Sequence, residues 1–260
     1  EDAYAADHTV SPFTYQKNNT TNLTLTSSYN RKFSARHTNQ TGFTYTRLFY
    51  NMRLNLAPFE TAPLNTLSKG KGQTDLISAY TSSSFGITDR LSVNAGLNSQ
   101  VLTLNNSWTL EPRLGIKWAP TTKSSFALAY GLHSRMEKMD VYFVNSKSTG
   151  KESVNKDLDF TKAHHLMLTF GYKLSDNLLL KVEPYAQFLY DVPVIADSSY
   201  SVLNRREFYV EETLVNKGKG RNIGVDITLE QYLSRGFYYL VTASVFDSKY
   251  KGGDGVWRNT

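Results

Sequence analysis

Apolar and polar residues alternate along the whole segment from Trp108 to Trp118. The even positions carry tryptophan, leucine, proline and isoleucine, whereas the odd positions carry threonine, glutamate, arginine, glycine and lysine. A period of two is typical of a β-strand with one apolar and one polar face. The segment is therefore predicted to be a strand whose two faces meet different environments.

The same period recurs elsewhere, for example from Leu91 to Leu97 and from Ile223 to Leu229. Together with the turn signals between the segments, it predicts about ten strands, near residues 22–29, 38–56, 74–87, 91–103, 108–118, 124–134, 162–174, 178–190, 221–233 and 237–250. Strands joined by short turns must be antiparallel. The predicted fold is all-β, an antiparallel up-and-down meander in sequence order, with residues 1–260 forming one domain.

The connections between these strands alternate between short and long. Short turns fall at 88–90, 119–123, 175–177 and 234–236, and long polar loops fall at 57–72, 133–160 and 191–219. Short turns on one rim and long loops on the other, with strands of ten or more residues, are typical of bacterial outer-membrane β-barrels. We therefore expect Asp89, Thr121, Asp176 and Arg235 on one rim, and Lys147, Ser199 and Gly253 on the other.

The two tryptophans that bound the first segment allow a geometric check. Ten residues at a rise of about 3.3 Å, tilted by about 40°, span about 25 Å along the membrane normal, which is the height of the apolar band of such barrels. The even face is predicted to contact lipid, with Trp108 and Trp118 at the two interfaces. The alternative is that both are ordinary core tryptophans of a soluble sandwich.

Two prolines conflict with a continuous hydrogen-bond ladder. Pro112 and Pro184 each follow a glutamate inside a predicted strand. Proline lacks the N–H group that the ladder requires, and a closed barrel has no edge strand that could accommodate it. We expect a local bulge at each proline.

The alternation also predicts which residues face lipid and which face the interior. The residues predicted to face lipid are Leu110, Leu114, Ile116, Leu128, Val225 and Ile227. The predicted interior positions include charges of both signs, as in wide barrels with a polar lumen: Arg47, Arg53, Glu111, Arg113, Lys181, Glu183, Asp226 and Glu230. The alternative is a solvated sheet face with no partner.

Composition narrows the functional classes. None of the 260 residues lies in a run of about 18 apolar residues, the length that a membrane-spanning helix requires. Aromatic residues make up 13%, too many for a disordered chain, and without cysteine there is no disulfide, thiolate nucleophile or cysteine metal site. The net charge of +6 does not indicate nucleic acid as a partner. The sequence shows no signal peptide, and its ends are interpreted as cuts within a longer protein.

Six segments resemble the β-barrel of TonB-dependent outer-membrane receptors. They are RLFYNMRL at 47–54, SWTLEPRLGIKW at 107–118, YGLHS at 130–134, VEPYAQFLYDVPV at 182–194, GRNIGVDITLE at 220–230 and DGVWRNT at 254–260. The resemblance runs from about Thr20 to Thr260. It implies a barrel of about 22 strands around an N-terminal plug, in the Gram-negative outer membrane, driven by the TonB complex to import scarce nutrients.

The sequence departs from this family because it lacks a plug, a TonB-contacting segment and a terminal aromatic residue. The resemblance then implies a barrel fragment of roughly the middle ten strands. Its implied partners are outer-membrane lipid, its own plug, the TonB complex through the missing N-terminal part, and a small nutrient. The nutrient class stays open among siderophore, cobalamin, glycan and peptide, and neither a cofactor nor nucleic acid is implied.

Other chemistry in the chain is weaker. His164 and His165 are adjacent, and neighbours in a strand point to opposite faces, so they cannot jointly hold one ion. A hydrolytic rim site would use His133, Asp157, Asp159 and His164 or His165, yet polar residues are what rim loops contain. We expect no catalytic residue and no metal site. Two KGKG runs, at 69–72 and 217–220, lack the spacing of a phosphate-binding loop and are interpreted as glycine-containing loop segments.

The predicted contribution to function is capture of a ligand by the long loops. They combine flat aromatic side chains with cations, which can hold rings and anions by stacking and charge; the candidates are Tyr142, Phe143, Arg205, Arg206, Tyr209, Trp257 and Arg258. The alternative is that these aromatics pack the loops against one another. Two other classes stay open: a complete ten-stranded barrel enzyme with a rim hydrolase site, and a soluble all-β binding module.

Overall fold

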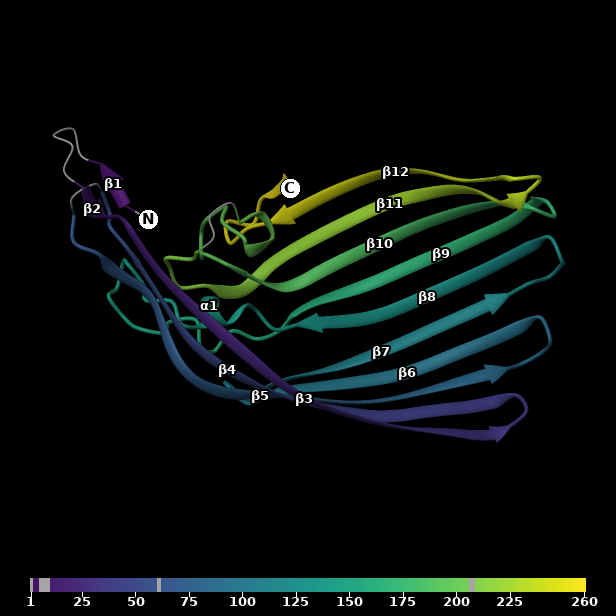
Figure 1. Cartoon of the computed structure of the whole chain (residues 1–260), viewed down its shortest axis with the longest axis horizontal. Coiled ribbons are helices and arrows are strands. Elements are labelled where there is room, and N and C mark those ends of the chain that lie inside the picture. Colours follow the sequence, from purple (N-terminus) through teal and green to yellow (C-terminus); the bar gives the residue numbers. More distant parts are fainter. Residues whose placement is uncertain (1, 5–9, 60–61, 206–208) are drawn as a thin grey trace.

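The computed structural model describes residues 2–4, 10–59, 62–205 and 209–260. Within these residues, eleven strands form one sheet in the order β13-β12-β11-β10-β9-β8-β7-β6-β5-β4-β3, so each strand lies beside its neighbours in sequence. All neighbouring pairs are antiparallel. The predicted all-β meander is confirmed. Figure 1 shows the sheet curled into an open trough, with short turns at one end and the loops at the other.

The ten predicted strands correspond to β3–β12, and a short eleventh strand follows them. The bounds are β3 (Thr14–Ser34), β4 (His37–Leu56), β5 (Asn65–Gly86), β6 (Leu91–Leu102), β7 (Ser107–Trp118), β8 (Ser124–Arg135), β9 (Thr161–Ser175), β10 (Leu178–Val194), β11 (Val215–Ser234), β12 (Phe237–Lys251) and β13 (Trp257–Asn259). A separate small sheet contains β1 (Asp2–Tyr4) and β2 (Val10–Pro12). Helical structure is limited, among the described residues, to α1 (Met139–Tyr142) and a 3-10 turn at Val202–Asn204.

Among the helices of the described chain, none is long and apolar enough to cross a membrane.

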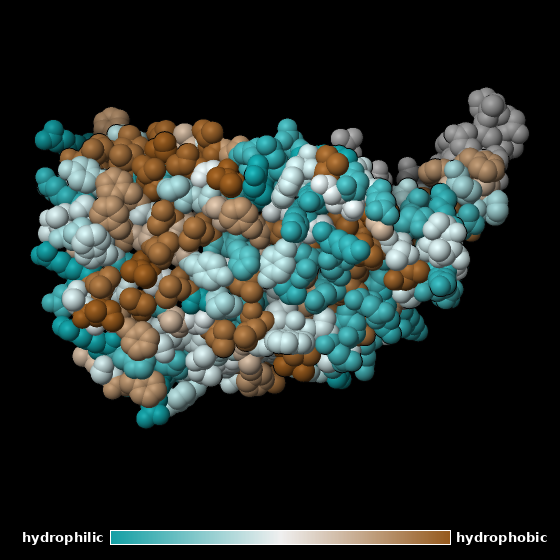
Figure 2. Space-filling model, turned by 180° about the vertical axis from the view of Figure 1, so that it is seen from behind, coloured by the Kyte–Doolittle hydropathy of each residue, from teal (hydrophilic) through white to brown (hydrophobic). Residues whose placement is uncertain are grey.

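The register assigns each side chain to the concave or the convex face of the trough. On β7, the odd positions share the concave face, and Arg113 lies opposite Gly131 of β8, which in turn lies opposite His165 of β9. The even positions share the convex face, where the rings of Trp118, Phe126 and Phe170 form a row with centroids 5.6 and 5.1 Å apart. By the same register, all six residues predicted to face lipid lie on this convex face. Figure 2 shows apolar residues gathered over the half of the molecule next to the short turns, and hydrophilic residues over the half next to the loops.

The strands are longer at their loop ends than the sequence pattern predicts. The long connections shrink to residues 57–64, 136–160 and 195–214, so both KGKG runs lie inside strands, in β5 and β11. Their interpretation as loop segments is wrong. These glycines leave room for other side chains: a Cβ on Gly70 would lie 2.7 Å from the Phe143 ring, and one on Gly220 would lie 2.7 Å from Leu203.

The bulges expected at the two prolines are absent. Pro184 pairs with Val225 of β11, and on its other side the pairing with β9 skips Glu183 and Pro184 and resumes in the same register at Tyr185. Pro112 pairs with Leu97 of β6, and on its other side the pairing with β8 ends at Arg113. Each proline therefore removes hydrogen bonds on one side only, without shifting the register.

The predicted interior position of Arg47 and Arg53 is wrong. Both lie on the convex face of β4, and Arg47 forms an ion pair of 2.9 Å with Asp75 of β5. The alternate residues Tyr50 and Met52 are buried on the concave side, where they contact the loop formed by residues 136–160. At the loop end the loop packs against the concave side of β4, so the apolar positions of this strand point inward.

Gly218 tests the importance of this loop-end packing. A Cβ at this position would lie against Val194 Cγ1 and 2.8 Å from the carbonyl oxygen of Val192. Because the backbone oxygen cannot move cheaply, we expect Gly218→Ala to lower the free energy of unfolding by about 1–3 kcal/mol. The control is Gly115→Ala, because a Cβ there meets Asn94 only at 3.8 Å. Thermal unfolding in detergent measures both, and equal midpoints would contradict the assignment.

Candidate functional site: the concave face and the loops folded over it

The loop formed by residues 136–160 turns back over the concave face of the sheet. Its apolar residues pack on β4, β6 and the loop before β11 in one cluster, which contains Tyr50, Met52, Leu102, Met139, Val141, Tyr142, Phe143, Val144, Leu158, Phe160, Val210 and Leu214. Tyr142 is fully buried, and its hydroxyl oxygen accepts a hydrogen bond of 3.1 Å from the backbone N–H of Glu137. Burial raises the pKa of Tyr142 to about 12. Tyr142 and Phe143 therefore pack the loop, as the alternative interpretation of these aromatics had it, and are not accessible to a ligand.

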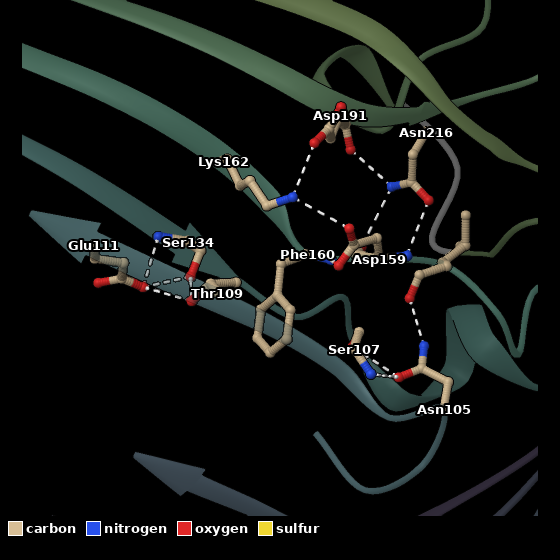
Figure 3. A network of polar contacts seen from close by, with 11 residues as sticks. Asn105, Ser107, Thr109, Glu111, Ser134, Asp159, Phe160, Lys162, Asp191 and Asn216 are labelled. Atoms are coloured by element: carbon tan, nitrogen blue, oxygen red, sulfur yellow. Dashed lines mark hydrogen bonds and ion pairs between the residues drawn. The ribbon is translucent and has the colours of Figure 1, made fainter. Parts of the chain in front are cut away.

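A polar network fixes the base of this loop to three strands and to the β6–β7 turn (Figure 3). Lys162 Nζ lies 3.1 Å from Asp159 and 3.0 Å from Asp191. The Asn216 amide donates to the carbonyl oxygens of Asp159 and Asp191, and Asn216 Oδ1 accepts from the backbone N–H of Asp159 at 2.9 Å. Asn105 Nδ2 donates to the carbonyl oxygen of Leu158 at 2.7 Å. The loop is thus held in place by groups from β9, β10, β11 and the β6–β7 turn.

The other predicted ligand residues have different surroundings. Arg205 is largely buried beside Asp140, at 3.7 Å. Arg258 donates to both carboxylate oxygens of Asp254, at 3.0 and 2.6 Å, and these hydrogen bonds lower the pKa of Asp254. Trp257 is exposed, and the Arg221 guanidinium lies 5.6 Å from its ring. Tyr209 is half-buried, and Arg206 lies outside the described residues. A direct role for any of these side chains in ligand binding stays a prediction.

Glu111 replaces missing ladder hydrogen bonds between β7 and β8. Beyond Arg113 and Gly131 these strands no longer pair, and we call this stretch the β7–β8 seam. Glu111 is 1% exposed within it. Its carboxylate accepts hydrogen bonds from the backbone N–H and the hydroxyl of Ser134 on β8, from Gln100 at 2.6 Å, from Asn98 at 3.0 Å and from Arg113 at 2.9 Å. One side chain therefore closes the gap left by Pro112. On the outer side of the seam lies a hollow of about 360 Å³, lined in part by Trp108 and Leu132.

Three hollows lie on the concave side at successive levels along the strands. The upper hollow, about 710 Å³, lies at Leu56 and is lined by Tyr209, Lys147 and Glu211 among others. The middle hollow, about 940 Å³, lies between β3, β4 and the chain from Arg135 to Val141. The deep hollow, about 820 Å³, lies at the level of Ser82. The register of β4 with β5 orders these levels from the loop end toward the turns.

The deep hollow is lined by one row of residues that are direct neighbours across eight strands. The row runs Ser82, Gly96, Arg113, Gly131, His165, Gln187, Asn222 and Ser248. Arg113 and Asp226 line this hollow, whereas Lys181 and Glu230, 3.9 Å apart, lie nearer the turns, as does Glu183, which accepts a hydrogen bond from Thr169. Six of the eight predicted interior charges thus lie on the concave face; contact with a plug stays a prediction.

The histidines are arranged differently from what a rim hydrolase requires. His164 lies on the convex face and shares a hydrogen bond with the Tyr130 hydroxyl, whereas His133 and His165 lie together on the concave face with ring centroids 4.8 Å apart. Asp159 is engaged by Lys162 and Asn216. No described hydrogen bond joins His133 or His165 to a carboxylate, and the described residues contain no group of three His, Asp or Glu side chains suited to a metal ion. The sequence brought His133 together with His164 or His165 but left open which of the two, because that choice depends on the register across a 25-residue loop.

The hydrogen bonds that Glu111 accepts across the β7–β8 seam predict that this residue is needed for stability. Glu111→Ala would remove the hydrogen bonds that the carboxylate accepts from the Ser134 N–H and from the Asn98 and Gln100 amides, and a hydrogen bond to a charged group contributes about 1.5–3 kcal/mol. We expect a lower thermal midpoint in detergent. Glu230→Ala is the matched control, because this concave carboxylate lies in β11 where the pairing with β10 and with β12 is unbroken, and its partner Lys181 is 3.9 Å away. A midpoint for Glu111→Ala equal to that of the control would refute the bridging role.

Comparison with known proteins identifies the fold. No family profile and no curated protein matches the sequence. Among solved structures, the chain is similar to the outer-membrane transporter YddB from Escherichia coli, with a TM-score of 0.65 and 13% identity over 90% of this chain and 34% of that one. It is also similar to the copper transporter OprC, with a TM-score of 0.64 and 12% identity over 93% and 39% of the two chains. The FrpB iron transporter from Neisseria meningitidis gives a TM-score of 0.63 and 13% identity over 92% and 38%.

The chain spans between a third and two fifths of the length of these transporters. At such low identity the likeness concerns the fold. Together with the antiparallel meander, the apolar convex face and the polar concave face, it confirms the expected architecture. The chain therefore has the fold of part of the β-barrel wall of outer-membrane transporters.

Proposed function

We propose that the chain forms part of the wall of a receptor that imports a scarce nutrient across the outer membrane, and that the concave hollows bind this nutrient on its way inward. The observation that carries the proposal is the series of three hollows along the inner side of a wall whose outer side suits lipid. In the intact protein, a plug would lie against the concave face and the TonB complex would supply energy through it.

The middle hollow has the chemistry of a site for an anionic or hydroxyl-rich ligand. On one side, β3 presents the side chains of Gln16, Asn18 and Asn22. On the other side, the chain after β8 presents Arg135 and Lys138, which are both exposed. Carboxamides donate and accept hydrogen bonds, and the cations favour phosphate, carboxylate or catecholate oxygens. This combination suits a siderophore chelate, a glycan or a peptide and requires no general base.

The comparisons support transport without deciding the cargo. The similar structures include a copper transporter, an iron transporter and the RagAB peptide importer. The last has a TM-score of 0.59 and covers 92% of this chain. Their range of ligands leaves siderophore, cobalamin, glycan and peptide open for this chain. A rim hydrolase has less support, because Asp159, its predicted acid, forms a structural ion pair with Lys162.

The test is uptake by the full-length receptor in cells that lack their own copy. Growth on iron chelates, cobalamin, glycans and peptides identifies the ligand, and uptake of that ligand is then measured for the double variant Arg135→Gln/Lys138→Gln. Removing two cations from the middle hollow should reduce the uptake of an anionic ligand by about tenfold or more, since each tenfold step needs only about 1.4 kcal/mol. The control is Arg90→Gln/Lys123→Gln, the same change of charge on the short-turn rim.

Two results would count against the proposal. One is growth that does not depend on the receptor for any nutrient of the panel. The other is hydrolysis of an ester or peptide substrate that is lost in His133→Ala and Asp159→Asn while uptake is unchanged, which would favour the enzyme.

A further inference from the structure

His133 and His165 form a pair of imidazoles that faces the deep hollow. His133 lies near the end of β8 and His165 near the start of β9, and both line the hollow. Their ring centroids are 4.8 Å apart and their planes are inclined by 59°. The rings are thus close and not stacked face to face. At this separation one nitrogen of each ring can bind the same ion, because a metal–nitrogen bond is about 2.0–2.1 Å long.

A glycine makes this approach possible. The Nε2 atom of His133 lies 2.6 Å from the position that a Cβ on Gly131 would occupy, so the ring folds back over Gly131. Gly131 is the direct cross-strand neighbour of His165. With any larger residue at 131, the His133 ring would have to turn away from β9. The backbone therefore leaves the room that brings the two imidazoles together.

The surroundings suit a metal cation. Met167, the next residue of β9 on the same face, is 43% exposed and lines the hollow with its thioether. Gln187 of β10 is the cross-strand neighbour of His165, and its Oε1 accepts a hydrogen bond from Asn222 at 3.1 Å. The Arg113 guanidinium is held by Glu111 at 2.9 Å, which offsets its charge. Asp226 adds a carboxylate to the lining.

We propose that His133 and His165 together bind one transition-metal ion at the wall of the deep hollow. Neutral imidazole is a good ligand for copper, nickel and zinc, and for a given site Cu²⁺ binds more tightly than Ni²⁺ or Zn²⁺. Water and the Met167 thioether or the Gln187 carbonyl are available for the remaining positions. The proposal does not depend on transport, since the wall binds the ion whatever nutrient the receptor carries.

The experiment uses the purified full-length protein in detergent, stripped of metal with a chelator, and CuSO₄ as the probe. Calorimetric titration should show a site that is weakened about tenfold or more by His133→Gln and equally by His165→Gln, a loss of about 1.4 kcal/mol or more. Electron paramagnetic resonance of the Cu²⁺ form should show coupling to two nitrogen nuclei, reduced to one in either variant. The matched control is His164→Gln, because its ring lies on the opposite face.

A second variant separates ligation from folding. Gly131→Val keeps both histidines but displaces the His133 ring, and it should also lose the two-nitrogen signal. Thermal midpoints without metal show whether each variant is folded, and only folded variants are compared. Copper binding that is unchanged in both His133→Gln and His165→Gln, or equally weakened in His164→Gln, would overturn the proposal. Uptake is measured separately, so its failure would not affect this result.

Discussion

A wall with lipid on one side must satisfy its backbone hydrogen bonds within the sheet, because lipid offers no partner for an exposed N–H or C=O. This constraint explains the long strands, their strict sequence order and the backbone pairing of every strand from β3 to β12 with its neighbours in sequence. It also explains where irregularity is tolerated. Pro184 leaves a gap between β10 and β9 that closes again at once in the same register, and Pro112 lies where Glu111 supplies acceptors in place of the ladder.

The trough changes character along its length. Near the turns its convex side carries apolar residues such as Trp118 and Phe126, and its concave side carries charged residues such as Lys181 and Asp226, as expected for a membrane wall around an aqueous lumen. Near the loops the concave side is covered by protein, and the residues that point inward include Tyr50 and Met52 of β4 and, on β5, Gly70 and Gly72, which leave room for Phe143 and Tyr50. On β4, the side chains on the concave face are therefore polar near the turns, as at Thr44 and Thr46, and apolar near the loops, as at Tyr50 and Met52.

The sequence predicted the fold well because the period of two in β7 and β11 holds wherever one face meets lipid and the other meets water. It failed for Arg47 and Arg53, since alternation shows that two faces differ but not which one a loop will cover. It failed for the KGKG runs because glycine and lysine lower strand propensity, whereas packing against Phe143 and Leu203 decides the conformation. Tyr142 could not be distinguished from a ligand-binding aromatic, because burial inside a folded loop depends on contacts distant in sequence. The His133–His165 pair likewise required the register.

The β7–β8 seam divides the sheet into two halves that are only partly joined by backbone hydrogen bonds. On one side of it, β3–β7 are joined by ladders that extend along nearly the whole of each shorter strand, and on the other side β8–β12 are joined in the same way. Between them, β7 and β8 pair only from Arg113 to Trp118, next to the turns. Beyond this stretch the two halves are connected by side chains: Glu111 and Thr109 of β7 bind Ser134 of β8, and Asn105 binds the backbone of the loop formed by residues 136–160. The backbone ladder therefore fixes the shape of the trough at its base, whereas at its mouth the width of the trough is set by a few side-chain contacts.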